Sequence, residues 1–151
     1  MMRRLLQILV VLGVMAAALM LRRRDDLPKT PEDTVSAFFD AAGRGDDATY
    51  LKLVSGDLRD SLQYARDQVG VEAFRANLRR SAAGIKGLAV SRRDDAPADM
   101  VGLNVEIVFV DRNERQQMLL ARRGDGWLIT SIDTAVTTKP SKAYGTPVYD
   151  E

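Results

Sequence analysis

Histidine and cysteine, the two side chains that most often carry catalysis and metal binding near neutral pH, are both absent from this sequence. Without histidine there is no side chain with an ordinary pKa near 7 and no imidazole ligand for a transition metal. Without cysteine there is no thiolate nucleophile, disulfide, zinc ribbon or lipid-modified N-terminal residue. We therefore predict no catalytic residue, no metal site and no cofactor, and a protein that is not an enzyme.

Arg-Gly-Asp, a tripeptide that some adhesive proteins use to bind integrins, occurs twice, at residues 44–46 and 123–125. In a turn, glycine supplies backbone freedom and aspartate supplies local hydrogen bonds. A tripeptide match also arises often by chance. Both copies are therefore predicted to be turns and not adhesion sites.

The single tryptophan, Trp127, follows the second copy at the start of an apolar alternation. A regular strand here would place two sets of side chains on opposite faces: Trp127, Ile129, Ser131 and Asp133 on one, and Leu128, Thr130 and Ile132 on the other. An indole at the start of a strand can close one end of a core while its N–H reaches a partner. We interpret Trp127 first as a marker of the closing strand, and second as a candidate pocket residue.

The first 24 residues predict a membrane anchor. No charge occurs from Leu5 to Leu21, and arginines close both ends of this run: Arg3, Arg4, Arg22, Arg23 and Arg24. A helix of this length spans roughly 25 Å, and it crosses a bilayer core of about 30 Å if the flanking arginines extend to the head groups. A signal peptide cleaved near the alanines at 16–18 is the alternative. The apolar run continues past those alanines, which favours an uncleaved anchor in the lipid bilayer.

The charge distribution bears on orientation and on partners. The arginines on the two sides of the apolar run nearly balance, so the positive-inside rule does not decide the orientation. A short basic cluster before an apolar run is typical of bacterial export, and we expect an extracytoplasmic domain on the cell membrane. The residues after position 24 carry 17 Lys and Arg against 21 Asp and Glu. Such a mildly acidic body argues against nucleic-acid binding.

A helix is predicted from residue 31 onward. Thr30 is a suitable N-cap, Pro31 suits the first helical position, and Asp33 stands at the capping-box position. Apolar residues recur at spacings of three and four and predict a core-facing side: Val35, Phe38, Phe39 and Ala42. Gly43 and Gly45 are expected to end this helix.

Three further helical segments are predicted. In residues 47–54, helical spacing places three apolar residues on one face: Tyr50, Leu51 and Val54. Residues 58–69 continue a helical stripe: Leu58, Leu62, Ala65 and Val69. After Gly70 another helix has the same spacing: Val71, Phe74 and Leu78. The arginines of this last helix lie near acidic residues and predict a solvated face, not an anion site.

The apolar period changes from 3.6 to 2 after Gly84 and Gly87, with Leu88 and Val90 alternating first. The next apolar alternation predicts a strand with one buried face: Val101, Leu103, Val105, Ile107 and Phe109. Residues 111–114 are predicted as a hairpin connection, 116–122 as a strand and 127–134 as the last strand. Residues 137–151 have two prolines and no period, and are predicted as a flexible tail.

Helices followed by an antiparallel meander predict an α+β domain at residues 30–136, after a linker at 25–29, with the helices packed on one face of a curved sheet. Three segments of the chain resemble the nuclear-transport-factor-2-like (cystatin-like cone) superfamily in their order and general residue pattern: AFFDAAGRGD, TYLKLV and RRGDGWLITSI. The likeness covers about residues 31–134 and is nearest to bacterial membrane-tethered or secreted members of unknown function. It implies a bent sheet wrapped around helices, an open end that often holds a pocket, and an open sheet face that often forms dimers.

The resemblance also implies where chemistry would lie. Isomerase and cyclase members carry an acid and a hydroxyl or acid donor in the cone, where burial tunes the carboxyl group. Residues of these types here are Asp40, Glu106, Asp133, Tyr50 and Tyr64. Asp40 falls between the apolar positions of its helix and Glu106 lies opposite the buried face of its strand, so we expect no cavity that the acids share. The candidate pocket residues are Tyr50, Tyr64 and Trp127.

Three functions from different classes follow. The first is a single-pass, non-catalytic interaction or small-ligand-binding module of the cell envelope, with a second copy or an envelope protein as partner. The second is a small-molecule isomerase or cyclase that uses a carboxylate in the cone. The third is a scaffold in an envelope or secretion assembly, since the inner-membrane subunit of type IV secretion systems also joins one anchor to such a fold, although this chain is shorter. We favour the first, because function depends on sites and no catalytic motif is present.

Overall fold

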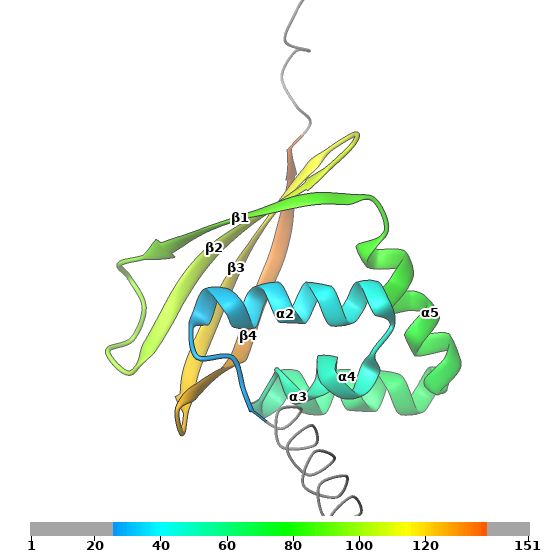
Figure 1. Cartoon of the computed structure of the whole chain (residues 1–151), viewed down its shortest axis with the longest axis horizontal. Coiled ribbons are helices and arrows are strands. Elements are labelled where there is room, and N and C mark those ends of the chain that lie inside the picture. Colours follow the sequence, from blue (N-terminus) through cyan, green and yellow to red (C-terminus); the bar gives the residue numbers. More distant parts are fainter. Residues whose placement is uncertain (1–25, 139–151) are drawn as a thin grey trace, which may run out of the picture.

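The computed structural model describes residues 26–138, which form an α+β domain (Figure 1). Four helices come first in the chain: α2 (Pro31–Arg44), α3 (Asp47–Lys52), α4 (Gly56–Val69) and α5 (Val71–Ala82). Four strands follow in one antiparallel sheet of order β1-β2-β3-β4: β1 (Ile85–Arg93), β2 (Met100–Phe109), β3 (Asn113–Arg123) and β4 (Gly126–Thr138). The predicted α+β class, with helices that precede an antiparallel meander in the chain and pack on it, is confirmed.

The predicted anchor at residues 1–24 lies outside the described residues, and so do residues 139–151 of the predicted tail. Within residues 26–138, no helix is both long enough and apolar enough to cross a membrane. β4 continues to Thr138, which pairs with Asn113 of β3. The last strand is therefore longer than the predicted 127–134, and the first two residues of the predicted tail are strand.

Local sequence determines where α2 begins and ends. The Thr30 hydroxyl oxygen accepts a hydrogen bond from the Asp33 backbone N–H at 3.1 Å, and Pro31 occupies the first helical position. Gly45 ends the helix in the left-handed conformation with φ of 65°. The capping prediction is confirmed, whereas Gly43 lies within the helix and does not end it.

Both Arg-Gly-Asp copies lie at turns, as predicted. Gly45 and Gly124 have φ of 65° and 62°, in the region that favours glycine. Asp46 caps α3, because its side chain accepts a hydrogen bond from the Thr49 N–H at 3.1 Å. Chain geometry therefore accounts for the glycine in both tripeptides and for the aspartate in the first.

The hydrophobic core lies between the helices and the inner face of the sheet, where α2 crosses the strands (Figure 1). Its buried residues come from α2, the connection from α3 to α4, and alternate positions of three strands: Val35, Phe38, Leu53, Val54, Leu103, Val105, Ile107, Phe109, Met118, Leu120 and Ile129. The buried face predicted for β2 is confirmed from Leu103 to Phe109.

The second half of α4 departs from the predicted buried stripe. Leu58 and Leu62 pack against the core, but no residue of α4 is buried. Ala65 is exposed, and Val69 is 50% exposed. Apolar spacing determines which side chains share a helix face, but it does not determine whether another element covers that face.

β4 does not keep the regular alternation that the sequence predicts. Leu119 of β3 pairs with Ser131, whereas Leu120 pairs with Ile129, so β4 holds one extra residue at a β-bulge. The bulge brings Ile132 onto the inner face, where it packs against the core. Ile129 and Ile132 therefore share a face, and their predicted placement on opposite faces is wrong.

The outer edge of β4 is covered near its start by segments that precede the sheet in the chain. The Trp127 N–H donates to the Pro28 carbonyl at 3.1 Å, the Ile129 N–H donates to the Leu53 carbonyl at 2.9 Å, and the Ser55 N–H donates to the Ile129 carbonyl at 2.9 Å. These bonds satisfy backbone groups that an open edge would leave unpaired. Trp127 lies at the start of the closing strand and packs against the core, as predicted.

Candidate functional site

The three candidate pocket residues occupy different environments. Tyr50, in α3, lines a cavity between the helices and the sheet. Tyr64, on α4, is 67% exposed and lies on the surface. Trp127 is partly buried against the core at the start of β4. Tyr50 is therefore the one of these three candidates that lines this cavity.

The acidic residues considered from the sequence lie outside this cavity. The side chain of Asp40 is 75% exposed and pairs with Arg44 at 3.1 Å on the surface of α2. Glu106 and Asp133 line a separate hollow of about 740 Å³ on the face of the sheet away from the helices. The expectation that the acids share no cavity is therefore wrong for this pair. There Glu106 accepts a hydrogen bond from the Asn113 amide at 3.1 Å. Tyr50 does not line this hollow, and Asp40, Glu106 and Asp133 do not line the cavity of Tyr50.

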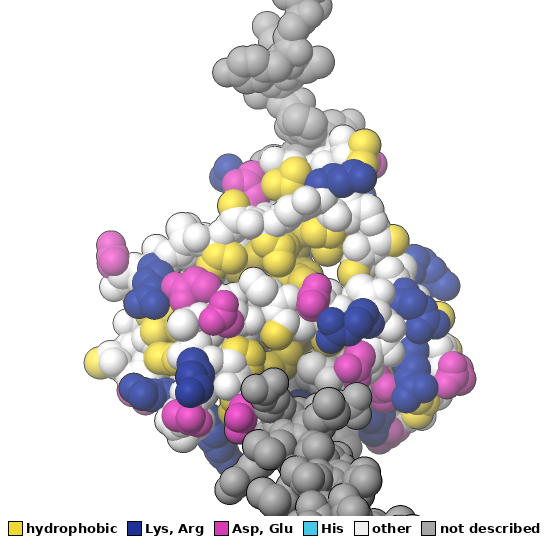
Figure 2. Space-filling model, viewed as in Figure 1, with side chains coloured by type: hydrophobic (Ala, Val, Ile, Leu, Met, Phe, Trp, Pro, Cys, Tyr) yellow, Lys and Arg dark blue, Asp and Glu magenta, His cyan; other side chains and the backbone are white. Residues whose placement is uncertain are grey.

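The cavity that contains Tyr50, called the inner pocket below, has a volume of about 280 Å³. Its walls combine apolar and polar surface in nearly equal parts and come from three helices and all four strands: Phe38, Phe39, Ala42, Tyr50, Ser81, Ala82, Ile85, Ile107, Phe109, Glu114, Gln116 and Ile132. A groove of about 630 Å³ between α2 and β1 shares Phe39, Ala82 and Ile85 with it. Figure 2 shows hydrophobic side chains at the surface between these two elements.

Strand register places two polar side chains on the inner face of the sheet. Glu114 pairs with Ile107, and Gln116 pairs with Val105. Because cross-strand partners point to the same face, Glu114 and Gln116 extend the row of buried β2 residues into polar positions. The inner pocket forms where the inner face changes from a packed core to these polar groups.

Tyr50 is held in the inner pocket by aromatic contacts. Its ring stacks on Phe38 with the ring centroids 4.2 Å apart, and it meets Phe74 edge-on at 6.3 Å. Burial raises the pKa of the Tyr50 hydroxyl to about 12, so it remains a protonated donor across the physiological range. Among residues 26–138, this hydroxyl has no hydrogen-bond partner.

Glu114 lies where the inner pocket meets the connection between β2 and β3. Its Oε1 accepts a hydrogen bond from Arg112 Nε at 2.7 Å, and the guanidinium of Arg112 lies 3.9 Å from the centre of the Phe109 ring. The side chains of Glu114 and Arg112 are 21% and 39% exposed, so this end of the pocket reaches the surface. Among the described residues, Glu114 Oε2 accepts no hydrogen bond.

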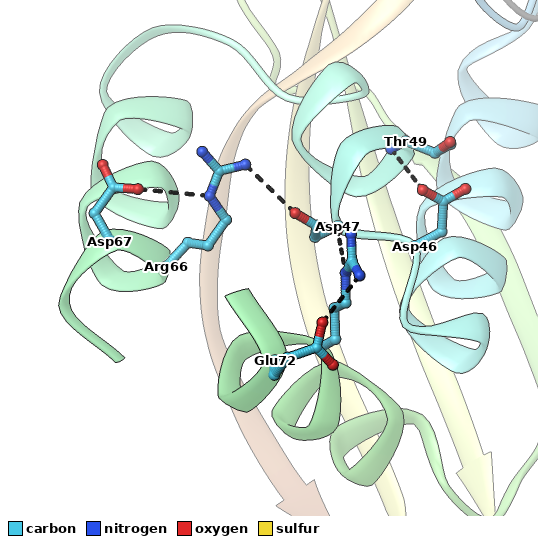
Figure 3. Close-up of polar contacts among 7 residues, drawn as sticks. Asp46, Asp47, Thr49, Arg66, Asp67 and Glu72 are labelled. Atoms are coloured by element: carbon cyan, nitrogen blue, oxygen red, sulfur yellow. Dashed lines mark hydrogen bonds and ion pairs between the residues drawn. The ribbon is translucent and has the colours of Figure 1, made fainter. Parts of the chain in front are cut away.

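A second polar cluster, around Asp47, joins α3, α4 and α5 (Figure 3). The Asp47 side chain is 6% exposed and accepts hydrogen bonds from Arg75 Nε at 2.7 Å and from Arg66 Nη1 at 3.4 Å. Arg75 also pairs with Glu72, and Arg66 pairs with Asp67. The Arg75 hydrogen bond is the main cause that lowers the pKa of Asp47. These contacts fasten α4 and α5 to α3, and their role is structural.

Sequence reasoning did not select Glu114, Gln116 or Asp47. The alternation of Met118 and Leu120 extends backward through Gln116 and Glu114, and this period could have placed both polar residues on the inner face. Instead, residue 114 was predicted to lie in the hairpin connection. Asp47 gives no local signal, because its partners lie 19 and 28 residues away in the chain.

Comparison with known proteins adds no relative: no family model matches this chain, and neither does any curated protein or solved structure. The chemistry of the inner pocket therefore has to be inferred from its own groups. Within residues 26–138, no group of three or more His, Cys, Asp or Glu side chains is arranged to hold a metal ion. The pocket offers a hydroxyl, a carboxylate oxygen and an amide around an aromatic and aliphatic wall, which is the composition of a small-molecule site.

Proposed function

We propose that this chain is a membrane-anchored, non-catalytic module whose inner pocket binds a small molecule with one apolar ring and one hydrogen-bond donor. One observation carries the proposal. Tyr50 and Glu114 line one pocket, and neither the Tyr50 hydroxyl nor Glu114 Oε2 has a hydrogen-bond partner among residues 26–138. A ligand that bonds to such groups replaces water there while its ring fills the apolar space.

Both oxygen groups are accessible to a ligand. Among the described residues, Arg66 Nε is the one fully enclosed side-chain nitrogen or oxygen atom that lacks a hydrogen-bond partner. The Tyr50 hydroxyl and Glu114 Oε2 are therefore not sealed inside the protein.

Size and charge narrow the ligand class. A volume of about 280 Å³ is just below the roughly 300–1,000 Å³ of pockets for drug-sized ligands, which suits a single ring with a short substituent. The lining includes the carboxylate of Glu114 and no Lys or Arg side chain. An anionic ligand would face like charge, so a neutral donor such as a hydroxyl or amide N–H is favoured.

Arg112 favours binding over catalysis. In isomerases and cyclases of the cone type, the catalytic carboxyl group depends on desolvation for its reactivity. Glu114 instead shares a 2.7 Å hydrogen bond with a cation. An isomerase or cyclase stays the second candidate, because a carboxylate and a tyrosine do line the same pocket.

Membrane attachment and family membership are parts of the same proposal. The uncharged run from Leu5 to Leu21 with arginines at both ends supports a single-pass anchor, and the short basic cluster before it favours a domain outside the cytoplasm. Helices over one face of a meander, with a pocket between them, support the nuclear-transport-factor-2-like resemblance. A second copy of the chain or an envelope protein is the proposed partner, and a scaffold role is the third candidate.

Ligand binding is tested on the full chain in lipid nanodiscs, with 3-fluorotyrosine replacing its four tyrosines and ¹⁹F NMR as the readout. p-Cresol, which has one ring and one donor, is expected to shift the Tyr50 signal saturably. The signal of Tyr64, which is exposed on α4, should stay in place. The variants Tyr50→Phe and Tyr64→Phe assign the two signals.

Toluene is the matched control ligand, because it has nearly the same size and no donor. A hydrogen bond to a charged oxygen contributes about 1.5 kcal/mol or more, so toluene should bind about tenfold more weakly. Equal affinity for the two compounds would contradict the donor requirement. A Tyr50 signal that does not saturate with p-cresol would contradict the pocket itself.

A topology reporter fused after Glu151 tests the membrane part separately. Activity of a reporter that works outside the cytoplasm, and silence of one that works inside, is the expected pair of results. The opposite pair would overturn the extracytoplasmic location and the envelope partner with it, while the ligand proposal would still stand on the NMR result.

A further inference from the structure

The chain leaves the sheet beside the inner pocket. β4 ends at Thr138, and the residue before it, Thr137, pairs with Glu114, which lines the pocket. Cross-strand partners lie about 5 Å apart. The segment 139–151, which lies outside the described residues, therefore starts within one residue pair of the pocket wall.

The same end of the pocket offers exposed contacts. Val110, in the connection between β2 and β3, is 75% exposed. Glu114 is 21% exposed, with Oε2 unpaired among the described residues. An apolar side chain and an open carboxylate oxygen thus lie where the chain departs from β4.

We propose that the ring of Tyr144 occupies the inner pocket and donates its hydroxyl hydrogen to the carboxylate of Glu114. A tyrosine side chain has the features that the pocket selects, one ring and one donor. Tyr144 is six positions after Thr138, and an extended segment of that length reaches roughly 20 Å. That reach exceeds the distance from β4 to any neighbouring strand of the sheet, since strands lie about 5 Å apart.

Charge distinguishes Tyr144 from Tyr149, the other tyrosine of this segment. Lys139 and Lys142 precede Tyr144 and carry the charge opposite to that of Glu114. Tyr149 is followed directly by two acidic residues, which would place like charges beside the same carboxylate. The sequence of the segment therefore favours Tyr144 as the occupant.

When the ring of Tyr144 occupies the inner pocket, it competes with any external small molecule for that pocket. A short linker holds an attached group at an effective concentration on the order of millimolar. A small molecule must then displace Tyr144, and its apparent affinity falls by the fraction of chains with an empty pocket. This inference uses the pocket of the proposed function, but it does not depend on the identity of any external ligand.

Isoleucine methyl NMR on the full chain tests the docking without a small molecule. Ile107 and Ile132 line the pocket, whereas Ile129 is fully buried in the core and does not line it. The variant Tyr144→Ala is expected to shift the methyl signals of Ile107 and Ile132, because it removes a ring current, and to leave that of Ile129 in place. Tyr149→Ala, the matched control, should leave all three unchanged.

Two results would overturn the docking. One is a set of pocket methyl signals that Tyr144→Ala does not move, and the other is an equal effect of Tyr149→Ala. A shift that disappears on dilution would assign the ring to a second copy and overturn the intramolecular contact. In the supporting case, the synthetic peptide KPSKAYGTPVYDE, added to the full-length Tyr144→Ala variant, restores the signals of the unaltered chain.

p-Cresol titration separates this inference from the proposed function. Tyr144→Ala is expected to bind p-cresol about tenfold more tightly than the unaltered chain, from an effective concentration about tenfold above the dissociation constant of the segment. Unchanged p-cresol affinity in Tyr144→Ala overturns the competition. If p-cresol does not bind even to Tyr144→Ala, the proposed function fails while the methyl result still decides the docking.

Discussion

Replacing Asp47 with asparagine tests whether one buried carboxylate holds the helical layer together. Asp47→Asn keeps the size of the side chain and removes its charge. The carboxylate is 6% exposed and accepts hydrogen bonds from Arg75 at 2.7 Å and Arg66 at 3.4 Å. We expect a destabilised domain in which α4 loosens first, since no residue of α4 is buried.

The magnitude follows from what each partner retains. Removal of one member of a fully buried ion pair costs about 3–5 kcal/mol, because it leaves an uncompensated charge. Here Arg75 keeps Glu72 at 3.2 Å and Arg66 keeps Asp67 at 3.6 Å. Both arginines also reach water, at 40% and 24% side-chain exposure. The expected loss of unfolding free energy is therefore about 2 kcal/mol, close to one charged hydrogen bond.

Urea unfolding of the full chain in a mild detergent, followed by Trp127 fluorescence, measures this loss. Asp40→Asn is the matched control, because Asp40 pairs with Arg44 at 3.1 Å with both side chains exposed. Such a surface pair contributes less than about 0.5 kcal/mol. Hydrogen exchange at the amides of α4 should accelerate in Asp47→Asn and not in the control.

The pH dependence gives a second, independent readout. The Arg75 hydrogen bond lowers the pKa of Asp47 below its ordinary value of 3.8. The carboxylate therefore contributes stability that is fully present above about pH 5 and is lost as the pH falls through its folded-state pKa. The stability gap between the unaltered chain and Asp47→Asn should stay constant from pH 5 to 8 and shrink below about pH 4. A loss no larger than that of Asp40→Asn, or a gap that persists unchanged to pH 3, would refute the ion-pair reasoning.

Three other perturbations have expected outcomes. Met118→Ala empties a position that is fully buried between sheet and helices, and should cost about 2–4 kcal/mol in urea unfolding; a loss under about 1 kcal/mol would contradict the assigned core. Thr30→Ala removes the hydroxyl that caps α2 and should cost about 1 kcal/mol, whereas Thr30→Ser should restore most of it. Burial raises the pKa of Tyr50 to about 12, so the difference in absorbance at 295 nm between the unaltered chain and Tyr50→Phe should show a group that titrates near pH 12. Because the pKa of the Tyr50 hydroxyl is raised in the folded state, its contribution to stability should be lost between about pH 10 and 12. A difference titration centred near pH 10 would refute the burial of Tyr50.

The features that sequence predicted correctly depend on neighbours in the chain. The Thr30 cap requires an oxygen three residues before an N–H, and the β2 face requires only alternation at every second residue. The left-handed Gly45 is equally local. These signals determined the fold class, the start of α2 and the buried face of β2 without any information on tertiary contacts.

The features that sequence missed depend on contacts between distant segments. The bulge in β4 shifts Ile132 to the inner face of the sheet. The alternation of residues within the strand does not predict this bulge. Glu114 enters the inner pocket because β3 begins earlier than predicted and pairs it with Ile107. Tyr50 was predicted as a pocket residue from its residue type alone. Its position in the pocket wall, with its ring stacked on Phe38, depends on the packing of α3 against α2.

The predicted linker at 25–29 is, from Leu27 onward, part of the domain. Leu27 packs against the core, and the Pro28 carbonyl accepts a hydrogen bond from the Trp127 N–H. A side chain at Gly126 would collide with the Leu27 Cβ atom, which explains why glycine opens the closing strand. With the proposed anchor ending at Leu21, five residues remain between membrane and domain, a reach of less than about 20 Å. Under the proposed anchoring, the domain would lie close to the bilayer surface, and the contact of Pro28 with Trp127 would limit how far the inner pocket lies from the membrane.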